Sequence, residues 1–211
     1  MKKRMARIGL VLAVGVGFAG TASAQTLEPT PTAAASVGSL GETSPLRLSL
    51  TLAPMPAGKF KSSFAGTDVE ADTAFAFALA PTIDYSFNQF AFIGFTPQYI
   101  FNVKGKDSTG DAAKELDLLL RLGGNAKVAD TIMLFGYLAP GYGIVMPSSG
   151  DSAKGFVIGF AAGALFDLTP GLFATGEIGY QLGYQSVKVG DLSVDFKTNF
   201  LRIGVGLGVR L

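Results

Sequence analysis

The sequence contains no cysteine, no histidine and no tryptophan among its 211 residues. Without cysteine the chain has no disulfide, no thiol nucleophile and no Cys-ligated zinc or iron–sulfur cluster. Without histidine it has neither an imidazole base nor a His-ligated metal. Charged residues are scarce, at 16% of the chain, and a net charge of +1 is no signature of nucleic-acid binding. We therefore expect no cofactor, no metal and no nucleic-acid partner.

The first 24 residues contain the three parts of a secretory signal peptide. Four basic residues within positions 2–7 precede an apolar run at 8–19, which is too short to span a bilayer as a helix. A cleavage motif, Ala22-Ser23-Ala24, follows, and cleavage is predicted between Ala24 and Gln25. Cleavage removes four of the 17 basic residues and none of the 16 acidic ones, which leaves a net charge of −3. Residues 25–44 lack periodicity and are predicted to form a flexible spacer.

After residue 44 the sequence alternates with a period of two, and no apolar run reaches 18 residues. In the last segment, large apolar residues alternate with glycine and arginine alone; the apolar set is Leu201, Ile203, Val205, Leu207, Val209 and Leu211. Such alternation is typical of strands with two different faces. Eight segments of this kind are found, at about 46–53, 74–86, 90–103, 115–126, 131–145, 156–166, 172–185 and 194–211. The segments at 131–145 and 156–166 alternate least cleanly, so their facing stays open.

The connections between these segments alternate in length. The longer ones are expected at 54–73, 104–114, 146–155 and 186–193, and the shorter ones near 88–89, 127–130 and 167–171. This alternation of long and short connections predicts that residues 45–211 form an all-β, eight-stranded, antiparallel, up-and-down transmembrane β-barrel. The alternative is a soluble β-barrel or sandwich with its apolar face inward. The barrel is favoured because the polar face is rich in small residues and the apolar face carries aromatics near the segment ends.

An eight-stranded barrel has an interior that side chains can fill. Six charged residues fall on the predicted inner face: Arg47, Asp84, Asp117, Arg121, Glu177 and Arg202. We expect a paired network centred on Glu177, Arg121 and Arg202 that closes the lumen, because unpaired charges in a narrow interior are costly. The alternative is a set of separate, water-solvated charges near the mouths of the lumen.

The stretch GFVIGFAAGALFDLTPGLFATGEIGYQLGYQ (155–185), followed by NFLRIGVGLGVRL (199–211), resembles the last hairpins of the outer-membrane β-barrel family. That family includes OmpA-type transmembrane domains, opacity-type proteins and small OmpX-like barrels. One departure is Leu211, where such barrels usually end in Phe. The resemblance implies location in the bacterial outer membrane, a periplasmic position for the spacer at 25–44, and assembly by the barrel-assembly machinery. It implies no specific activity, because this fold hosts adhesins, anchors and enzymes.

The function expected from these features is a non-enzymatic structural or surface-interaction role. Small-barrel enzymes use a histidine that this chain lacks, and the remaining Ser152 and Lys154 fall in a predicted loop. The alternatives are a narrow small-solute channel and a soluble periplasmic binding protein. The expected partners are outer-membrane lipids and lipopolysaccharide, with no defined extracellular ligand.

The stretch 59–64 mixes lysines with phenylalanines, and a hairpin that extends beyond the bilayer is favoured there over a lipopolysaccharide contact. The acidic stretch 68–72 lacks a calcium-hand pattern and is interpreted as a hydrophilic loop.

Overall fold

The computed structural model describes residues 45–64, 67–189 and 192–211. The predicted signal peptide, its cleavage point between Ala24 and Gln25, and the spacer at 25–44 lie outside the described residues. No helix in the described part of the chain is long and apolar enough to cross a bilayer.

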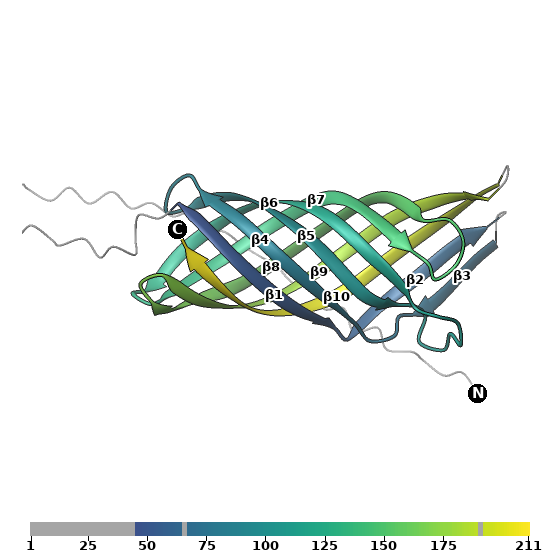
Figure 1. The fold of residues 1–211 in the computed structure, drawn as a ribbon, viewed down its shortest axis with the longest axis horizontal. Coiled ribbons are helices and arrows are strands. Elements are labelled where there is room, and N and C mark those ends of the chain that lie inside the picture. Colours follow the sequence, from purple (N-terminus) through teal and green to yellow (C-terminus); the bar gives the residue numbers. More distant parts are fainter. Residues whose placement is uncertain (1–44, 65–66, 190–191) are drawn as a thin grey trace, which may run out of the picture. The chain divides into compact units, whose positions relative to one another are not determined.

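Ten antiparallel strands form one closed sheet (Figure 1). The strands are β1 (Leu46–Met55), β2 (Ala57–Phe64), β3 (Thr67–Asp72), β4 (Ala76–Ser86), β5 (Ala91–Val103), β6 (Ala113–Ala129), β7 (Ile132–Met146), β8 (Ala153–Thr169), β9 (Leu172–Val189) and β10 (Leu192–Arg210). Each strand from β4 to β10 pairs with its sequence neighbour, and β1 pairs with both β4 and β10. The last pairing closes the ring, which confirms the predicted all-β antiparallel barrel.

The ten strands make an eight-stranded ring because two of the barrel strands are each interrupted once. β4 pairs with β1 from Tyr85↔Leu46 to Ala76↔Met55, and β3 continues on β2 in the same register at Asp72↔Lys59. β1 with β2 is therefore one long strand, and β3 with β4 is its partner. The first break falls at Pro56, which has no N–H to donate to the ladder.

Two connections predicted as long loops are extended hairpins instead. The segment 54–73 contains β2 and β3, and β2 also pairs with the distal part of β10 at 194–201. The segment 186–193 is part of the β9–β10 ladder, which still pairs at Leu192↔Val189. The polar composition of these segments reflects strands that continue beyond the apolar band of the barrel. The hairpin favoured for 59–64 is confirmed by β2 and β3.

The short connections gather at one end of the barrel, which we call the turn end. Asn88 accepts hydrogen bonds from the backbone N–H groups of Phe90 and Ala91 at 2.8 and 2.9 Å, closing the β4–β5 turn. Thr169 similarly accepts one from Leu172 at 3.2 Å, closing the β8–β9 turn. The opposite end, which we call the loop end, carries the β2–β3 hairpin and the connections at 104–112 and 147–152.

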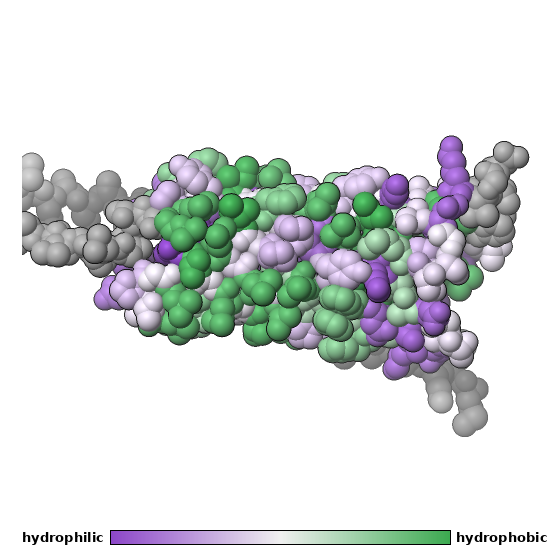
Figure 2. All heavy atoms as spheres, in the orientation of Figure 1, coloured by the Kyte–Doolittle hydropathy of each residue, from purple (hydrophilic) through white to green (hydrophobic). Residues whose placement is uncertain are grey.

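The barrel has an apolar exterior and a polar interior. Leu207 on β10 is 59% exposed, as is its neighbour Val205, and both alternate with inward glycines. Figure 2 shows apolar side chains gathered on the barrel wall toward the turn end and hydrophilic ones at the loop end. The facing of β7 and β8, open from the sequence, is set by the burial of Tyr137 and Val157, which point inward.

Glycines leave room for the larger inward side chains. On β10 a Cβ at Gly208 would overlap the ring of Phe173, which is 2% exposed. A Cβ at Gly204 would lie 2.7 Å from Cγ of Glu177. The glycine–apolar alternation of the last strand therefore serves both faces of the wall: lipid-compatible residues outside, and space for β9 side chains inside.

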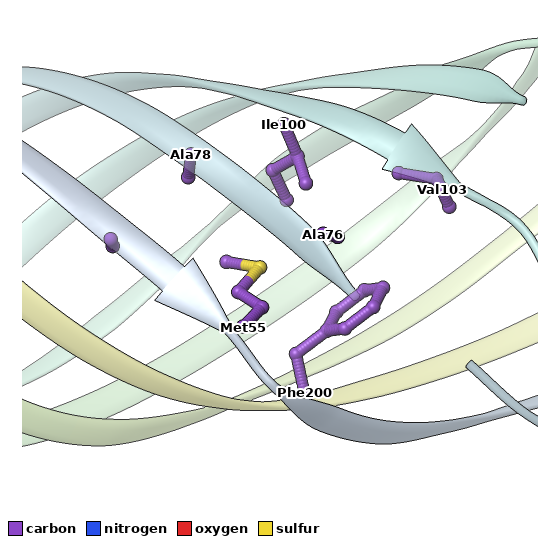
Figure 3. Close-up of a cluster of buried hydrophobic side chains, with 7 residues drawn as sticks. Met55, Ala76, Ala78, Ile100, Val103 and Phe200 are labelled. Atoms are coloured by element: carbon purple, nitrogen blue, oxygen red, sulfur yellow. The ribbon is translucent and has the colours of Figure 1, made fainter. Parts of the chain in front are cut away.

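An apolar cluster fills the lumen near the loop end (Figure 3). It contains side chains from β1, β4, β5 and β10, namely Ala53, Met55, Ala76, Ala78, Ile100, Val103 and Phe200. Met55, Ile100 and Phe200 are fully buried at 0% exposure. This end of the interior is therefore packed with apolar side chains, as a protein core is.

Candidate functional site in the barrel lumen

Five of the six predicted charged residues meet in the half of the lumen nearer the turn end. Arg47 lies on β1, Asp84 on β4, Arg121 on β6, Glu177 on β9 and Arg202 on β10. All five are buried, with less than a tenth of each residue exposed. Strand alternation turns each of them inward, and closure of the ring brings strands that are distant in sequence to a common interior. Together with Tyr137 we call these residues the arginine layer.

Three ion pairs join the five charges. The guanidinium of Arg202 contacts Glu177 with an Nη2–Oε1 distance of 2.6 Å. Asp84 accepts a hydrogen bond from Arg121 at 3.1 Å, and Nη2 of Arg47 lies 3.8 Å from the same Oδ2 atom. Because the layer holds three arginines and two carboxylates, its formal net charge is +1.

Tyr137 links the two ion-pair groups. Its hydroxyl donates to the Glu177 carboxylate at 3.2 Å and accepts from Nη1 of Arg202 at 3.2 Å. The guanidinium of Arg121 lies over its ring, 4.0 Å from the ring centroid. The inward position of Tyr137 could not be predicted, because segment 131–145 alternates poorly.

Asp84 reaches Arg121 across an intervening strand, and a glycine makes this possible. The register places Gly94 of β5 between Asp84 of β4 and Arg121 of β6. A Cβ at Gly94 would overlap Oδ1 of Asp84. The ion pair between Asp84 and Arg121 therefore requires a glycine at position 94. The sequence alone does not reveal this requirement, beyond placing Gly94 on the inward face of its strand.

A further ion pair, which was not predicted from the sequence, lies at the turn end. Arg210 Nη2 contacts Asp167 Oδ1 at 2.6 Å, and the Arg210 guanidinium stacks over Phe173 at 5.4 Å. Asp167 was interpreted only as a turn residue. A cavity of about 800 Å³ opens at this end and is bounded toward the interior by Arg47 and Arg210.

Asp117 lies apart from the arginine layer, contrary to its predicted place in one network with the other five charges. It accepts hydrogen bonds from Gln98 and Gln181 at 3.3 and 2.7 Å. On β6 the inward residue Leu119, 2% exposed, separates it from Arg121. Asp117 contacts neither lysine nor arginine as an ion pair within the part of the chain that the structure describes.

The space left within the arginine layer is small. One cavity of about 20 Å³ is lined by Arg47, Asp84 and Glu177, and one of about 10 Å³ by Arg121, Tyr137 and Arg202. A cavity needs roughly 10–15 Å³ to hold one water molecule. The geometry therefore allows isolated waters between the charged groups rather than a column of water.

No protein-family model matches the chain, and no curated protein matches its sequence. Solved structures do match in fold. The outer membrane protein OprG from Pseudomonas aeruginosa superposes with a TM-score of 0.50 at 14% identity, covering 79% of this chain and 98% of OprG. Neisserial surface protein A gives a TM-score of 0.49 at 14% identity, covering 77% of this chain and 97% of that protein.

The likeness to OprG concerns the fold alone, since identity is low. It agrees with two features of this chain, namely the ring of antiparallel strands and an exterior of large apolar side chains. An exterior of this kind suits the hydrocarbon core of a bilayer, and closure of the ring satisfies the backbone groups that lipid cannot. The chain therefore has the fold of an outer-membrane β-barrel, with a ring of eight strands, and is similar in this fold to OprG.

Proposed function

We propose that this protein is a non-enzymatic outer-membrane barrel with a closed lumen that acts through the surface it presents outside the cell. The observation that carries the proposal is the arginine layer, whose buried ion pairs join β1 and β6 to β4 and join β10 to β9, with Tyr137 of β7 linking the two groups. A water-filled pore needs a continuous path, and this layer supports only isolated waters. The apolar cluster of Figure 3 supports closure at the loop end as well.

The loop end is the surface proposed to face the outside, because outer-membrane barrels carry short turns in the periplasm and longer connections outside. The β2–β3 hairpin is its most extended described part, and its charges are paired across the strands. Lys59 contacts Glu70 at 2.5 Å and Lys61 contacts Asp68 at 2.6 Å. This pairing supports a role for the hairpin as a rigid, mixed-charge platform rather than a bare basic patch.

The partners proposed for this barrel follow from its location. The exterior contacts outer-membrane lipid, and lipopolysaccharide headgroups surround the loop end. The barrel-assembly machinery is proposed to insert the chain. Ser152 precedes β8 at the loop end and Lys154 is exposed, an arrangement that supports solvated surface residues rather than a catalytic pair.

Planar-bilayer recording tests the closed lumen. The parent protein should show no steady conductance, and Glu177→Gln should show openings because it breaks the Arg202 ion pair and removes one acceptor of Tyr137. Glu70→Gln, which removes an exposed ion pair on the hairpin, is the matched control and should behave as the parent. A large, stable conductance in the parent would overturn closure and favour the narrow-channel alternative.

A further inference from the structure

Two buried carboxyl groups lie in the lumen on the loop-end side of the arginine layer, where Glu115 pairs in register with Ile100 of the apolar cluster and Asp117 with Gln98. Glu115 and Asp117 occupy successive inward positions of β6 and are both fully buried, at 0% exposure. Their side chains are neighbours on one face of the strand, two residues apart. Neither forms an ion pair with a lysine or arginine in the described ranges. Two adjacent, unpaired carboxylates in a dry interior are strongly unfavourable unless something compensates their charge.

Three glutamine side chains surround these carboxyl groups from β5 and β9. Gln185 donates to Glu115 at 2.7 Å, and Gln181 donates to Asp117 at 2.7 Å. Gln98 donates to Asp117 at 3.3 Å and to Oε1 of Gln181 at 2.7 Å. The contacts cross the lumen, because β9 lies on the far side of the ring from β5 and β6. We call these five residues the carboxylate–amide cluster.

The cluster contains more acceptors than donors. Four of its oxygen atoms, all buried, have no hydrogen-bond partner: Gln98 Oε1, Glu115 Oε2, Asp117 Oδ1 and Gln185 Oε1. The two glutamines that carry such oxygens are 0% and 2% exposed. Buried polar atoms are almost always satisfied, so four such oxygens in one cluster favour a ligand that oxygen atoms can bind.

Two glycines lie against these polar atoms. A Cβ at Gly143 on β7 would lie 2.7 Å from Asp117 Oδ1 and 3.1 Å from the Gln185 amide nitrogen. A Cβ at Gly183 on β9 would lie 2.6 and 3.0 Å from the two polar atoms of the same amide. The carboxylate of Asp117 and the amide of Gln185 therefore lie close together against these glycines, and a larger residue at either position would displace them.

We propose that the carboxylate–amide cluster binds a single Ca²⁺ ion inside the barrel. Calcium takes six to eight oxygen ligands from carboxylates and amide carbonyls in flexible geometry, whereas Mg²⁺ demands octahedral geometry and keeps several waters. The four unsatisfied oxygens, with the second oxygens of the two carboxylates, supply a set of this kind. Two carboxylates balance the charge of a divalent ion. The apolar cluster of Figure 3, contributed partly by Met55 and Phe200, lies toward the loop end and slows exchange of the ion with the outside.

The test measures calcium directly and then its effect on stability. The full mature chain is folded into lipid vesicles with CaCl₂, passed through a chelating column to remove surface calcium, and analysed for metal by mass spectrometry. The expected result is one Ca²⁺ per chain in the parent and none in the double variant E115Q/D117N. The matched control is D68N/E70Q, which removes two acids at the same i, i+2 spacing from the exposed strand β3 and should retain the ion.

Stability supplies the second readout. Free Ca²⁺ at 100 times its Kd should raise the folding equilibrium constant of the parent about 100-fold, with no change for E115Q/D117N and none from equal MgCl₂. The proposal is overturned if the parent retains no calcium, or if Ca²⁺ shifts the parent and E115Q/D117N equally; the two carboxyls then share a proton instead. The calcium content of the parent protein can be measured without any variant. This measurement therefore tests the proposal even if a substitution prevents folding.

Discussion

Removal of Glu177 should destabilise the barrel more than removal of Arg202, although the two residues form one ion pair. Both side chains are buried, at 5% and 9% exposure, and their contact distance is 2.6 Å. The arginine layer carries a formal charge of +1, so Glu177→Gln raises it to +2, whereas Arg202→Gln lowers it to zero. Each remaining partner keeps its hydrogen bond with Tyr137, so the difference lies in the charge: the first change leaves an excess of two positive charges in the layer, and the second leaves it neutral.

The size of each effect follows from the cost of stranding a buried charge. Breaking a buried ion pair by removing one partner costs about 3–5 kcal/mol, and Glu177→Gln is expected in that range. Arg202→Gln should cost about 2–3 kcal/mol, because it leaves the layer neutral. The double variant should cost less than the sum of the two, with a coupling energy of about 0.5–3 kcal/mol.

Urea unfolding in lipid vesicles, followed by far-ultraviolet circular dichroism, measures these free energies; the chain has no tryptophan to report by fluorescence. Glu70→Gln on the exposed hairpin is the control, since water and salt screen its pair with Lys59. The reasoning is refuted if the two single variants are additive in the double variant, or if Arg202→Gln is the more damaging change.

Three further changes test the facing of β10, the role of Gly94 and the hairpin charges. Val205→Arg places a charge in the lipid band and should cost about 2–4 kcal/mol near the midplane, by the same unfolding assay; a variant as stable as the parent would reverse the facing assigned to β10. Gly94→Ala should separate Asp84 from Arg121 and destabilise the barrel by about 1–3 kcal/mol, whereas Gly171→Ala, with open space around its Cβ position, should not. The pKa values of Asp68 and Glu70 are lowered by hydrogen bonds from Lys61 and Lys59, and those lysine pKa values are raised by the same contacts. The pairing is therefore present at neutral pH and is lost as pH falls through carboxyl pKa values that lie below the ordinary ones, so amide-exchange protection of β2 and β3 should be weaker in strong acid than at neutral pH; equal protection at both would contradict the pairing.

The fold could be predicted because a barrel wall imposes a period of two on the sequence. Outward residues meet lipid and inward residues meet a narrow interior, so β10 shows apolar residues on one face and glycine or arginine on the other. The ends of strands could not be predicted in the same way. Beyond the bilayer both faces meet water and the alternation disappears, so the bounds of β2 and β3 could not be found within the connection expected at 54–73.

The arginine layer was predictable only in part. Inward charges can be found from alternation, but their partners depend on which strands face each other across the lumen. Arg202 and Glu177 meet on neighbouring strands, whereas Arg121 meets Asp84 across β5, past Gly94. Neutral partners such as Tyr137 and Gln98 carry no charge signal, so the sequence offered no reason to select them from other inward residues.

The inner face of β6 shows why the lumen contains two different sites rather than one network. Its inward residues run Glu115, Asp117, Leu119, Arg121, at about 6.6–6.8 Å per step along the strand. Leu119 is fully apolar, so no hydrogen bond can pass through it from the carboxylates to Arg121. On the Arg121 side of Leu119, each charge has a protein partner of opposite sign. On the Asp117 side, hydrogen-bond acceptors outnumber donors. Closure should therefore respond to changes in the arginine layer, and calcium retention to changes in the carboxylate–amide cluster, so that each proposal can fail without the other.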